Sequence, residues 1–303
     1  MICFVRNTKL VIDWHNFGYS ILALKLGDAH PLVMVSRLYE TALARAGFAH
    51  FAVTDVMGKL LSTKLVKNAP VLSLHDRPAE LFRPLAPSER IAFLSQSPLL
   101  AEYFTPIIDG KTRLVVSSTS WTADEDFSVL LDALRSYSAS ATSSHPQLPE
   151  LIVVITGKGP QKDFYLTKVE ELQKKDALEM VTIKTAWLSF EDYALLLGSA
   201  DLGVSLHTSS SGVDLPMKVV DMFGAGLPVI GWDNFEAWPE LVTEDVNGKG
   251  FASAENMADL LRQLFEPGNS LLPRLKEGAG KESGRRWDTE WNAVAGRLFE
   301  LTT

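Results

Sequence analysis

The sequence has almost no cysteine and no long apolar run. Cys3 is the one cysteine among the 303 residues, so no intrachain disulfide can form, and this composition fits a reducing compartment. No stretch reaches the roughly 18 consecutive apolar residues that a membrane-spanning helix needs. A charged N-terminal region followed by a long apolar segment is also missing, so we expect no secretory signal and a chain that faces the cytosol.

Basic residues are outnumbered by acidic ones. The 29 lysines and arginines against 37 aspartates and glutamates give a formal net charge of −8. An anionic surface repels nucleic acid and we find no local basic stripe, so we expect no nucleic-acid partner. Apolar residues make up 46% of the chain and charged residues 22%, which is close to the averages of globular proteins. The length corresponds to about two domains.

Short apolar segments alternate with amphipathic ones along most of the chain. This alternation predicts an α/β fold with two Rossmann-like domains, the first over 1–75 and the second over 107–303. Five prolines interrupt residues 76–106, which predicts a linker or lid between the domains. The predicted strands are 9–15, 49–54, 71–74, 114–117, 151–155, 181–184, 202–206 and 227–230. The predicted helices are 31–46, 55–66, 124–136, 160–174, 189–199, 216–223, 235–241, 254–265 and 288–300, with a loop at 138–149.

Polar and aromatic residues follow the strands predicted for the second domain. Ser118, Thr119 and Ser120 follow the first of these strands. Lys158 lies in a Gly-Lys-Gly turn after the next strand, and Trp187 lies beyond the third. Because parallel sheets bind ligands at the carboxyl ends of their strands, these residues are candidate ligand contacts. The alternative is that they form ordinary loops and packing contacts.

The most informative segment follows the predicted strand at 202–206. His207 leads into a loop of small residues that runs directly into the helix predicted over 216–223. Such a loop lets backbone N–H groups approach an anion, and the N-terminus of the helix adds a partial positive charge. The loop residues that we expect to bind a diphosphate are Ser209, Ser210, Ser211 and Gly212.

Two side chains of the following helix extend this prediction. Lys218 lies near the first turn, where it can contact a phosphate. Asp221 lies one turn further on, where its carboxylate can accept hydrogen bonds from two adjacent sugar hydroxyls. An anion site followed by a diol acceptor is what a nucleoside diphosphate requires. An ordinary serine-rich cap of a helix is the alternative, but it does not explain Lys218, Asp221 and the Gly-x-Pro strand entry together.

The segment from Asp221 to Val229 resembles the nucleotide-sugar motif of glycosyltransferases with the GT-B fold. It reads Asp-Met-Phe-Gly-Ala-Gly-Leu-Pro-Val, where the family has Glu-Ala-Met-Ala-x-Gly-x-Pro-Val. Asp221 stands at the position of the family's ribose-binding glutamate. Asp214 lies near the first acidic residue of the family's pair, with a spacing one residue shorter. The resemblance implies two Rossmann-like domains, with the donor nucleotide bound by the second.

Further segments are similar to one family within that fold, the beta-mannosyltransferases of the dolichol pathway. These segments are 10–16, 116–127, 155–160 and 200–224. The resemblance implies inverting transfer of mannose from GDP-mannose to dolichol-diphosphate-linked chitobiose, at the cytosolic face of the endoplasmic reticulum membrane. Other dolichol-pathway transferases are then expected partners. Family members begin with a membrane anchor and the first part of the acceptor-binding domain, so we expect residues 1–75 to be an incomplete, membrane-facing domain.

The resemblance also suggests catalytic roles. An inverting transfer needs a base for the acceptor hydroxyl and stabilisation of the leaving diphosphate. His15 and Asp13, at the end of the first predicted strand, are rival candidates for the base, or they only order their own loop. Lys158 and Lys218 are the expected cationic clamps on the diphosphate.

Trp187 is expected to stack on guanine and His207 to face the transferred sugar. We expect no metal and no cofactor, because Asp124-Glu125-Asp126 falls in the first turn of a predicted helix, where negative charge suits the helix dipole, and no His or Cys cluster supports a metal. Two alternatives stay open. One is a homologue that binds a nucleotide sugar or a partner without turnover, and the other is a GT-B enzyme that uses a UDP-sugar.

Overall fold

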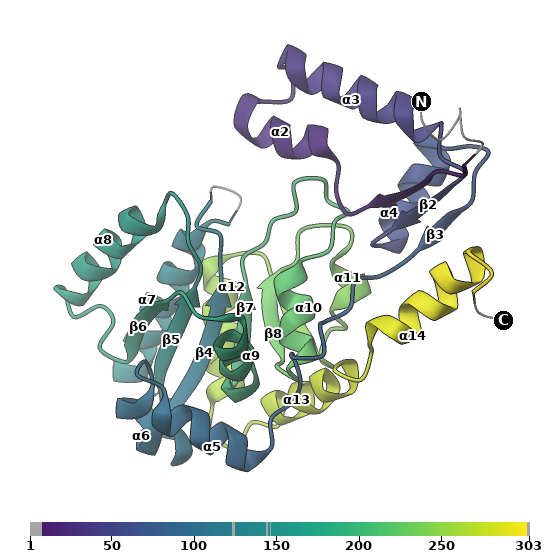
Figure 1. Cartoon of the computed structure of the whole chain (residues 1–303). Helices are drawn as coiled ribbons and strands as arrows, with labels where there is room; N and C mark the ends of the chain where they lie inside the picture. The colour runs from purple at the N-terminus through teal and green to yellow at the C-terminus, as the bar shows by residue number, and fades with distance from the viewer. Residues whose placement is uncertain (1–7, 123–124, 144, 146, 302–303) are drawn as a thin grey trace.

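The computed structural model describes residues 8–122, 125–143, 145 and 147–301, and these residues form two parallel β-sheets (Figure 1). The smaller sheet has the order β1-β2-β3, with β1 at Val11–Trp14, β2 at Ala49–Ala52 and β3 at Val71–Ser73. The larger sheet has the order β6-β5-β4-β7-β8-β9. Its strands are β4 (Thr112–Ser118), β5 (Glu150–Thr156), β6 (Val181–Ala186), β7 (Leu202–Ser205), β8 (Val229–Trp232) and β9 (Gly248–Phe251).

Alternate residues of the central strands of the larger sheet enter two separate apolar cores. Val115 and Val153 face one core, whereas Val116 and Val154 face the other. The first core is closed mainly by α7 (Phe127–Ser143), α8 (Lys162–Gln173), α12 (Ala254–Phe265) and α13 (Leu271–Glu282). The second is closed mainly by α5 (Pro87–Gln96), α6 (Phe104–Ile108), α9 (Phe190–Ser199), α10 (Met217–Gly224) and α11 (Trp238–Leu241), with a short 3-10 turn η2 (Ala101–Tyr103).

The strand order of the larger sheet reverses between β4 and β7. The chain runs outward from β4 through β5 to β6, then returns to the other side of β4 to form β7. The loops that leave β4 and β7 therefore diverge and open a crevice at the carboxyl edge, which is the usual ligand site of such sheets. This edge carries the residues that the sequence singled out.

Residues 76–106, which we expected to be a linker or lid, pack against the larger sheet. Phe82, Leu94 and Leu100 are buried in the second core, and α5 extends well beyond the short helical turn that we expected near 91–94. Gly224 lacks a side chain where a Cβ atom would lie 2.4 Å from Pro78, so the proline-rich segment lies directly on α10. The prolines shape a packed strap rather than a free connection.

The smaller sheet is covered by elements from both ends of the chain. Trp14, Phe17 and Met57 form a core with Val213 and Val220 from the larger domain. On the other side, α14 (Trp287–Trp291) and the π-helix η3 (Asn292–Gly296) cross back over the sheet (Figure 1). The remaining elements of this region are α2 (Gly18–Leu26), α3 (Pro31–Ala44), α4 (Asp55–Leu60) and the π-helix η1 (Leu61–Leu65). No helix among the described residues is both long and apolar enough to cross a membrane.

Several predicted boundaries were wrong. Helix α7 begins at Phe127, so Glu125 and Asp126 precede the helix, and Asp124 lies outside the described residues. The helix continues to Ser143, so the first part of the segment 138–149, which we expected to be a loop, is helical. The serines of this segment satisfy their hydroxyls on backbone carbonyls one turn earlier, as Ser140 does with Ser136. The sequence analysis also missed α2, β9 and α13.

Candidate functional site

A cavity of about 570 Å³ opens at the carboxyl edge of the larger sheet. It lies where β4, β5 and β6 end and where α9 and α10 begin. Seven predicted donor-site residues line it: Ser118, Thr119, Ser120, Lys158, Trp187, Lys218 and Asp221. A larger hollow of about 770 Å³ lies at the opposite edge, where β4 and β7 start, and none of the predicted site residues lines it.

The two loops at the floor of this cavity are in close contact. A Cβ atom at Gly157 would lie 1.8 Å from the carbonyl oxygen of Thr119, and one at Gly159 would lie 1.8 Å from that of Ser120. Gly157 also has a φ of +132°, which side chains disfavour. These glycines bring Lys158 next to the loop after β4. The Gly-Lys-Gly turn therefore serves loop packing, with the lysine directed over the Trp187 ring, 4.2 Å from its centroid.

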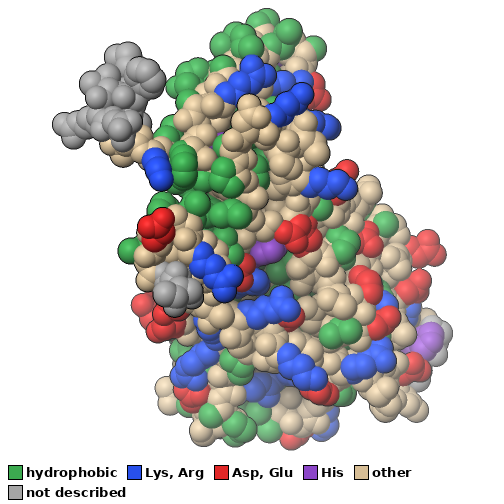
Figure 2. All heavy atoms as spheres, turned by 90° about the vertical axis from the view of Figure 1, so that its right-hand side faces the viewer, with side chains coloured by type: hydrophobic (Ala, Val, Ile, Leu, Met, Phe, Trp, Pro, Cys, Tyr) green, Lys and Arg blue, Asp and Glu red, His purple; other side chains and the backbone are tan. Residues whose placement is uncertain are grey.

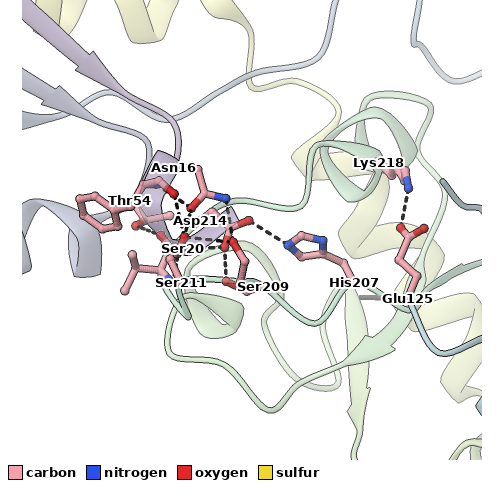
Figure 3. A network of polar contacts seen from close by, with 12 residues as sticks. Asn16, Ser20, Thr54, Glu125, His207, Ser209, Ser211, Asp214 and Lys218 are labelled. Carbon is pink, nitrogen blue, oxygen red and sulfur yellow. Dashed lines mark hydrogen bonds and ion pairs between the residues drawn. The ribbon is translucent and has the colours of Figure 1, made fainter. Parts of the chain in front are cut away.

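Glu125 is a site residue that the sequence analysis missed. Its side chain is buried, and its Oε2 atom accepts hydrogen bonds from the Thr119 hydroxyl at 2.7 Å and from the Ser120 backbone N–H at 2.5 Å. Its Oε1 atom pairs with the Lys218 ammonium at 2.5 Å (Figure 3). In the sequence, Glu125 stands between two aspartates near the start of a predicted helix. Nothing in that pattern distinguishes a buried carboxylate that holds a loop from an exposed charge at a helix N-terminus.

Asp221 of α10 lines the same cavity. Burial raises the pKa of Asp221 from 3.8 to about 7. Because the ionised carboxylate is poorly solvated there, it is a strong acceptor for hydroxyl groups of a ligand. The far wall of the cavity is aromatic: Tyr193 hydrogen-bonds Ser118 at 2.8 Å, and Trp187 is 65% exposed at the rim.

The serine loop after β7 lies elsewhere than expected. None of Ser209, Ser210, Ser211 or Gly212 lines the 570 Å³ cavity. The loop turns instead toward the smaller domain, where Ser210 contacts Asn16 at 3.3 Å and Ser20 at 3.2 Å. The serine loop therefore makes a contact between the two domains. The polar groups that lie beside Lys218 in the cavity come from the loop after β4 instead.

Asp214 is the organising group of the serine loop. His207 contacts it at 3.0 Å, Ser211 donates to it at 3.2 Å, and Ser209 donates through a short hydrogen bond (Figure 3). Burial alone favours the protonated acid, but the hydrogen bonds from His207 and Ser209 prevail and hold the pKa of Asp214 below its usual value. Asp214 and His207 thus support this loop. Whether either contacts a sugar stays a prediction.

His15 and Asp13 lie together at the end of β1. The His15 ring contacts Asp13 through Nε2 at 3.1 Å and Asp76 through Nδ1 at 3.2 Å. Burial lowers the pKa of His15, but the charges of Asp76 and Asp13 outweigh it and raise the pKa above its usual value. Both ring nitrogens of His15 are engaged by carboxylates, which leaves neither directed at an acceptor hydroxyl, so this geometry favours Asp13 over His15 as the base.

One further polar cluster joins the two domains. Asp55, His75 and Glu240 offer atoms close enough to surround a metal ion. Both oxygens of Glu240 already accept backbone N–H groups, from Asp55 at 2.6 Å and Val56 at 2.8 Å. The two ring nitrogens of His75 face Glu240 and Glu290. These side chains fasten α4 to the larger domain.

Comparisons with known proteins identify the family. A family model described as glycosyl transferases group 1 matches residues 110–267. The chitobiosyldiphosphodolichol beta-mannosyltransferase of Arthroderma benhamiae is 55% identical over 305 residues, which cover 100% of this chain and 68% of that protein. This chain belongs to the chitobiosyldiphosphodolichol beta-mannosyltransferase family. The resemblance stated from the sequence and the predicted GT-B α/β fold are confirmed.

One further sequence relative and one solved structure are similar to this chain. The UDP-glycosyltransferase TURAN of Arabidopsis thaliana is 40% identical, over 97% of this chain and 71% of that protein. The solved structure of Anabaena Alr3699/HepE in complex with UDP and glucose matches with a TM-score of 0.69 at 15% identity, covering 98% of this chain and 73% of the other. This structural likeness shows the fold alone. The chain spans 68% to 71% of the length of the two sequence relatives.

Proposed function

We propose that this member of the chitobiosyldiphosphodolichol beta-mannosyltransferase family transfers mannose, with inversion, from GDP-mannose to dolichol-diphosphate-linked chitobiose. The observation that carries the proposal is the cavity that combines Lys158, Lys218 and Asp221 at the carboxyl edge of a parallel sheet. Two cations suit a diphosphate, and a buried carboxylate suits the vicinal hydroxyls of a ribose.

We place the donor in the cavity in one orientation. The ribose hydroxyls donate to Asp221, the diphosphate lies against Lys218 and Ser120, and the base lies against the aromatic wall at Trp187. Lys158 reaches the diphosphate when its ammonium leaves the Trp187 ring, whose centroid is 4.2 Å away. Lysine ammonium groups balance the charge that develops on the leaving diphosphate, so we propose that the reaction needs no divalent metal and no cofactor. Because the rim at Trp187 is exposed, the base can enter and leave without a large rearrangement.

The transfer is a single in-line displacement at the anomeric carbon. The acceptor hydroxyl oxygen forms the new bond to that carbon while the bond to the donor phosphate oxygen breaks, and GDP leaves with the electron pair. Asp13 accepts the proton of the acceptor hydroxyl, and the His15 ring lies between Asp13 and Asp76. Asp76 holds the ring from the second side, which keeps Asp13 oriented.

The acceptor is a lipid, and the smaller domain carries an apolar surface that suits a membrane. We call this surface the α2–α3 face; its exposed side chains include Leu24, Met34, Val35, Leu38 and Tyr39, and Leu38 is 72% exposed. Figure 2 shows hydrophobic side chains gathered at the end of the molecule that α3 occupies in Figure 1. We propose that this face contacts the endoplasmic reticulum membrane from the cytosolic side, where other dolichol-pathway transferases are partners.

The test measures donor binding and transfer with the purified chain. Thermal unfolding and calorimetry are recorded with GDP-mannose, UDP-glucose and UDP-GlcNAc, and transfer is followed with a short-chain lipid diphosphate chitobiose. We expect stabilisation by GDP-mannose and a mannosylated product. Stabilisation by UDP-sugars alone would mean that the donor is a UDP-sugar and not GDP-mannose. The name of the Arabidopsis relative makes this outcome worth testing. Binding of GDP-mannose without product would support a homologue that binds without turnover.

A further inference from the structure

Glu125 connects two elements of the donor cavity without lining it. It is 3% exposed and lies behind the loop after β4, in a part of the fold distinct from the serine loop (Figure 3). One oxygen fixes Thr119 and Ser120, and the other fixes Lys218, although Glu125 and Lys218 are 93 residues apart in sequence. All three of these neighbours line the cavity.

The geometry around Lys218 leaves donors directed at a ligand. An ammonium group has three N–H donors. Among the described residues, one is used by Glu125 at 2.5 Å and one by the Ser120 hydroxyl oxygen at 3.3 Å. The third remains for an oxygen of the ligand. Since the Ser120 oxygen accepts from Lys218, the Ser120 hydroxyl hydrogen is also directed away from Lys218 and can reach the same ligand.

We propose that Glu125 is a positioning residue for the diphosphate of the donor. It acts through Lys218 and Ser120, which it holds in one arrangement before the ligand arrives. A buried carboxylate near an anion site opposes the ligand by charge, so simple charge attraction cannot be its role. Its contribution is to remove the side-chain freedom that a long lysine would otherwise lose on binding. This inference rests on the proposed binding of a nucleoside diphosphate in this cavity.

A glutamine at position 125 cannot reproduce this arrangement. Both carboxylate oxygens of Glu125 accept hydrogen bonds, from Lys218 on one side and from Thr119 and Ser120 on the other. A side-chain amide has one accepting oxygen and one donating nitrogen. In either orientation, Glu125→Gln therefore sets a donor against a donor, either at Lys218 or at the loop.

The experiment is a double-mutant cycle between Glu125→Gln and Lys218→Ala, read by calorimetry with GDP and with guanosine. We expect Glu125→Gln to weaken GDP binding about tenfold, the usual size of one lost charged hydrogen bond, and guanosine binding less than twofold. In the Lys218→Ala background, the glutamine can turn its oxygen toward Thr119 and Ser120 and its amide nitrogen toward the space that Lys218 has left, so Glu125→Gln should cause little further loss. Asp126→Asn is the matched control, since Asp126 is exposed and bonds Ser128.

Each outcome decides the inference. Equal losses for GDP and guanosine, or losses that add in the double variant, would overturn it in favour of a purely structural role. If Glu125→Gln does not fold, as thermal unfolding would show, the same cycle uses Glu125→Asp, which keeps the charge but is one methylene shorter. If the unchanged chain binds neither GDP nor UDP, the proposed function fails. Nucleotide binding combined with additive losses overturns only the role of Glu125.

Discussion

Two buried carboxylates each hold one loop at the carboxyl edge of the larger sheet. Glu125 collects Thr119, Ser120 and Lys218 beside the cavity, whereas Asp214 collects the hydroxyls of the serine loop. A buried carboxylate with two or more donors is stable only as a complete set, because losing one donor leaves a charge without compensation. Loop shape at this edge therefore depends on single acidic residues as much as on glycines.

Asp221 provides a residue-scale prediction about stability. Its pKa is raised by burial from 3.8 to about 7, so between these pH values the folded chain keeps a proton that the unfolded chain has lost. The free energy of unfolding must fall as pH rises through this window and level off above it. Asp221→Asn should therefore stabilise the ligand-free chain at pH 8, on the order of 2 kcal/mol, and change it little at pH 4. Thermal unfolding at both pH values tests this.

The same residue gives a prediction about binding. The ionised carboxylate accepts the ribose hydroxyls, so affinity for GDP-mannose should rise as pH increases through about 7. The diphosphate diester of GDP-mannose does not titrate in this range, so the change comes from the protein, and the Asp221→Asn variant assigns it to Asp221. Asp221→Asn should bind more weakly and lose the pH dependence, as calorimetry across this range would detect. An unchanged profile in the variant would place the ribose elsewhere.

At the scale of elements, the proline-rich strap is predicted to be part of the core. Phe82 is fully buried against α9 and α10, so Phe82→Ala should lower the free energy of unfolding by about 3–5 kcal/mol. Leu81→Ala is the control, because its neighbour Leu81 is exposed and should lose less than about 0.5 kcal/mol. Denaturant unfolding measures both. If both variants lost only a similar, small amount of unfolding free energy, residues 76–106 would be a separate linker and not part of the core.

Helix α3 carries a prediction about the membrane. Leu38 is exposed at the centre of the α2–α3 face, so Leu38→Glu should leave the fold intact and weaken binding to phosphatidylcholine–phosphatidylinositol vesicles about tenfold. Val246→Glu is the control, because Val246 is an exposed apolar residue of the larger domain. Flotation with vesicles measures the difference. Equal binding by both variants would contradict membrane contact through this face.

Strands and helices were predicted correctly where the hydrophobic period and the flanking turn residues indicated the same element. The strands β4, β5, β6 and β7 lie within one or two residues of the predictions, because their apolar runs are bounded by polar turns. Helix α2 was missed because it is apolar on nearly all sides, so its sequence shows no helical period. The serine loop shows the limit most clearly: composition indicated an anion cradle, but its contacts are set by Asp214 and by Asn16, which lies 194 residues from Ser210.

At the scale of the whole molecule, polar side chains fasten the two domains beside their shared apolar core. Glu240 caps the first N–H groups of α4 across the domain boundary. Glu240→Ala should therefore cost about 1–2 kcal/mol of unfolding free energy and separate the unfolding of the two domains. Glu236→Ala, at an exposed glutamate in the loop just before α11, should change neither. Chemical denaturation followed by fluorescence distinguishes the cases, and identical curves for the two variants would refute the role of Glu240.

The return of α14 and η3 over the first sheet has a consequence for biosynthesis. Phe51 and Leu74 bury their side chains against Ala295, which is synthesised more than 200 residues after both of them. During translation one flank of the first sheet therefore stays uncovered until α14 and η3 have emerged, while the strands of the larger sheet are made in between. Newly made chains are thus exposed to misassembly at this flank for as long as the intervening residues are being synthesised.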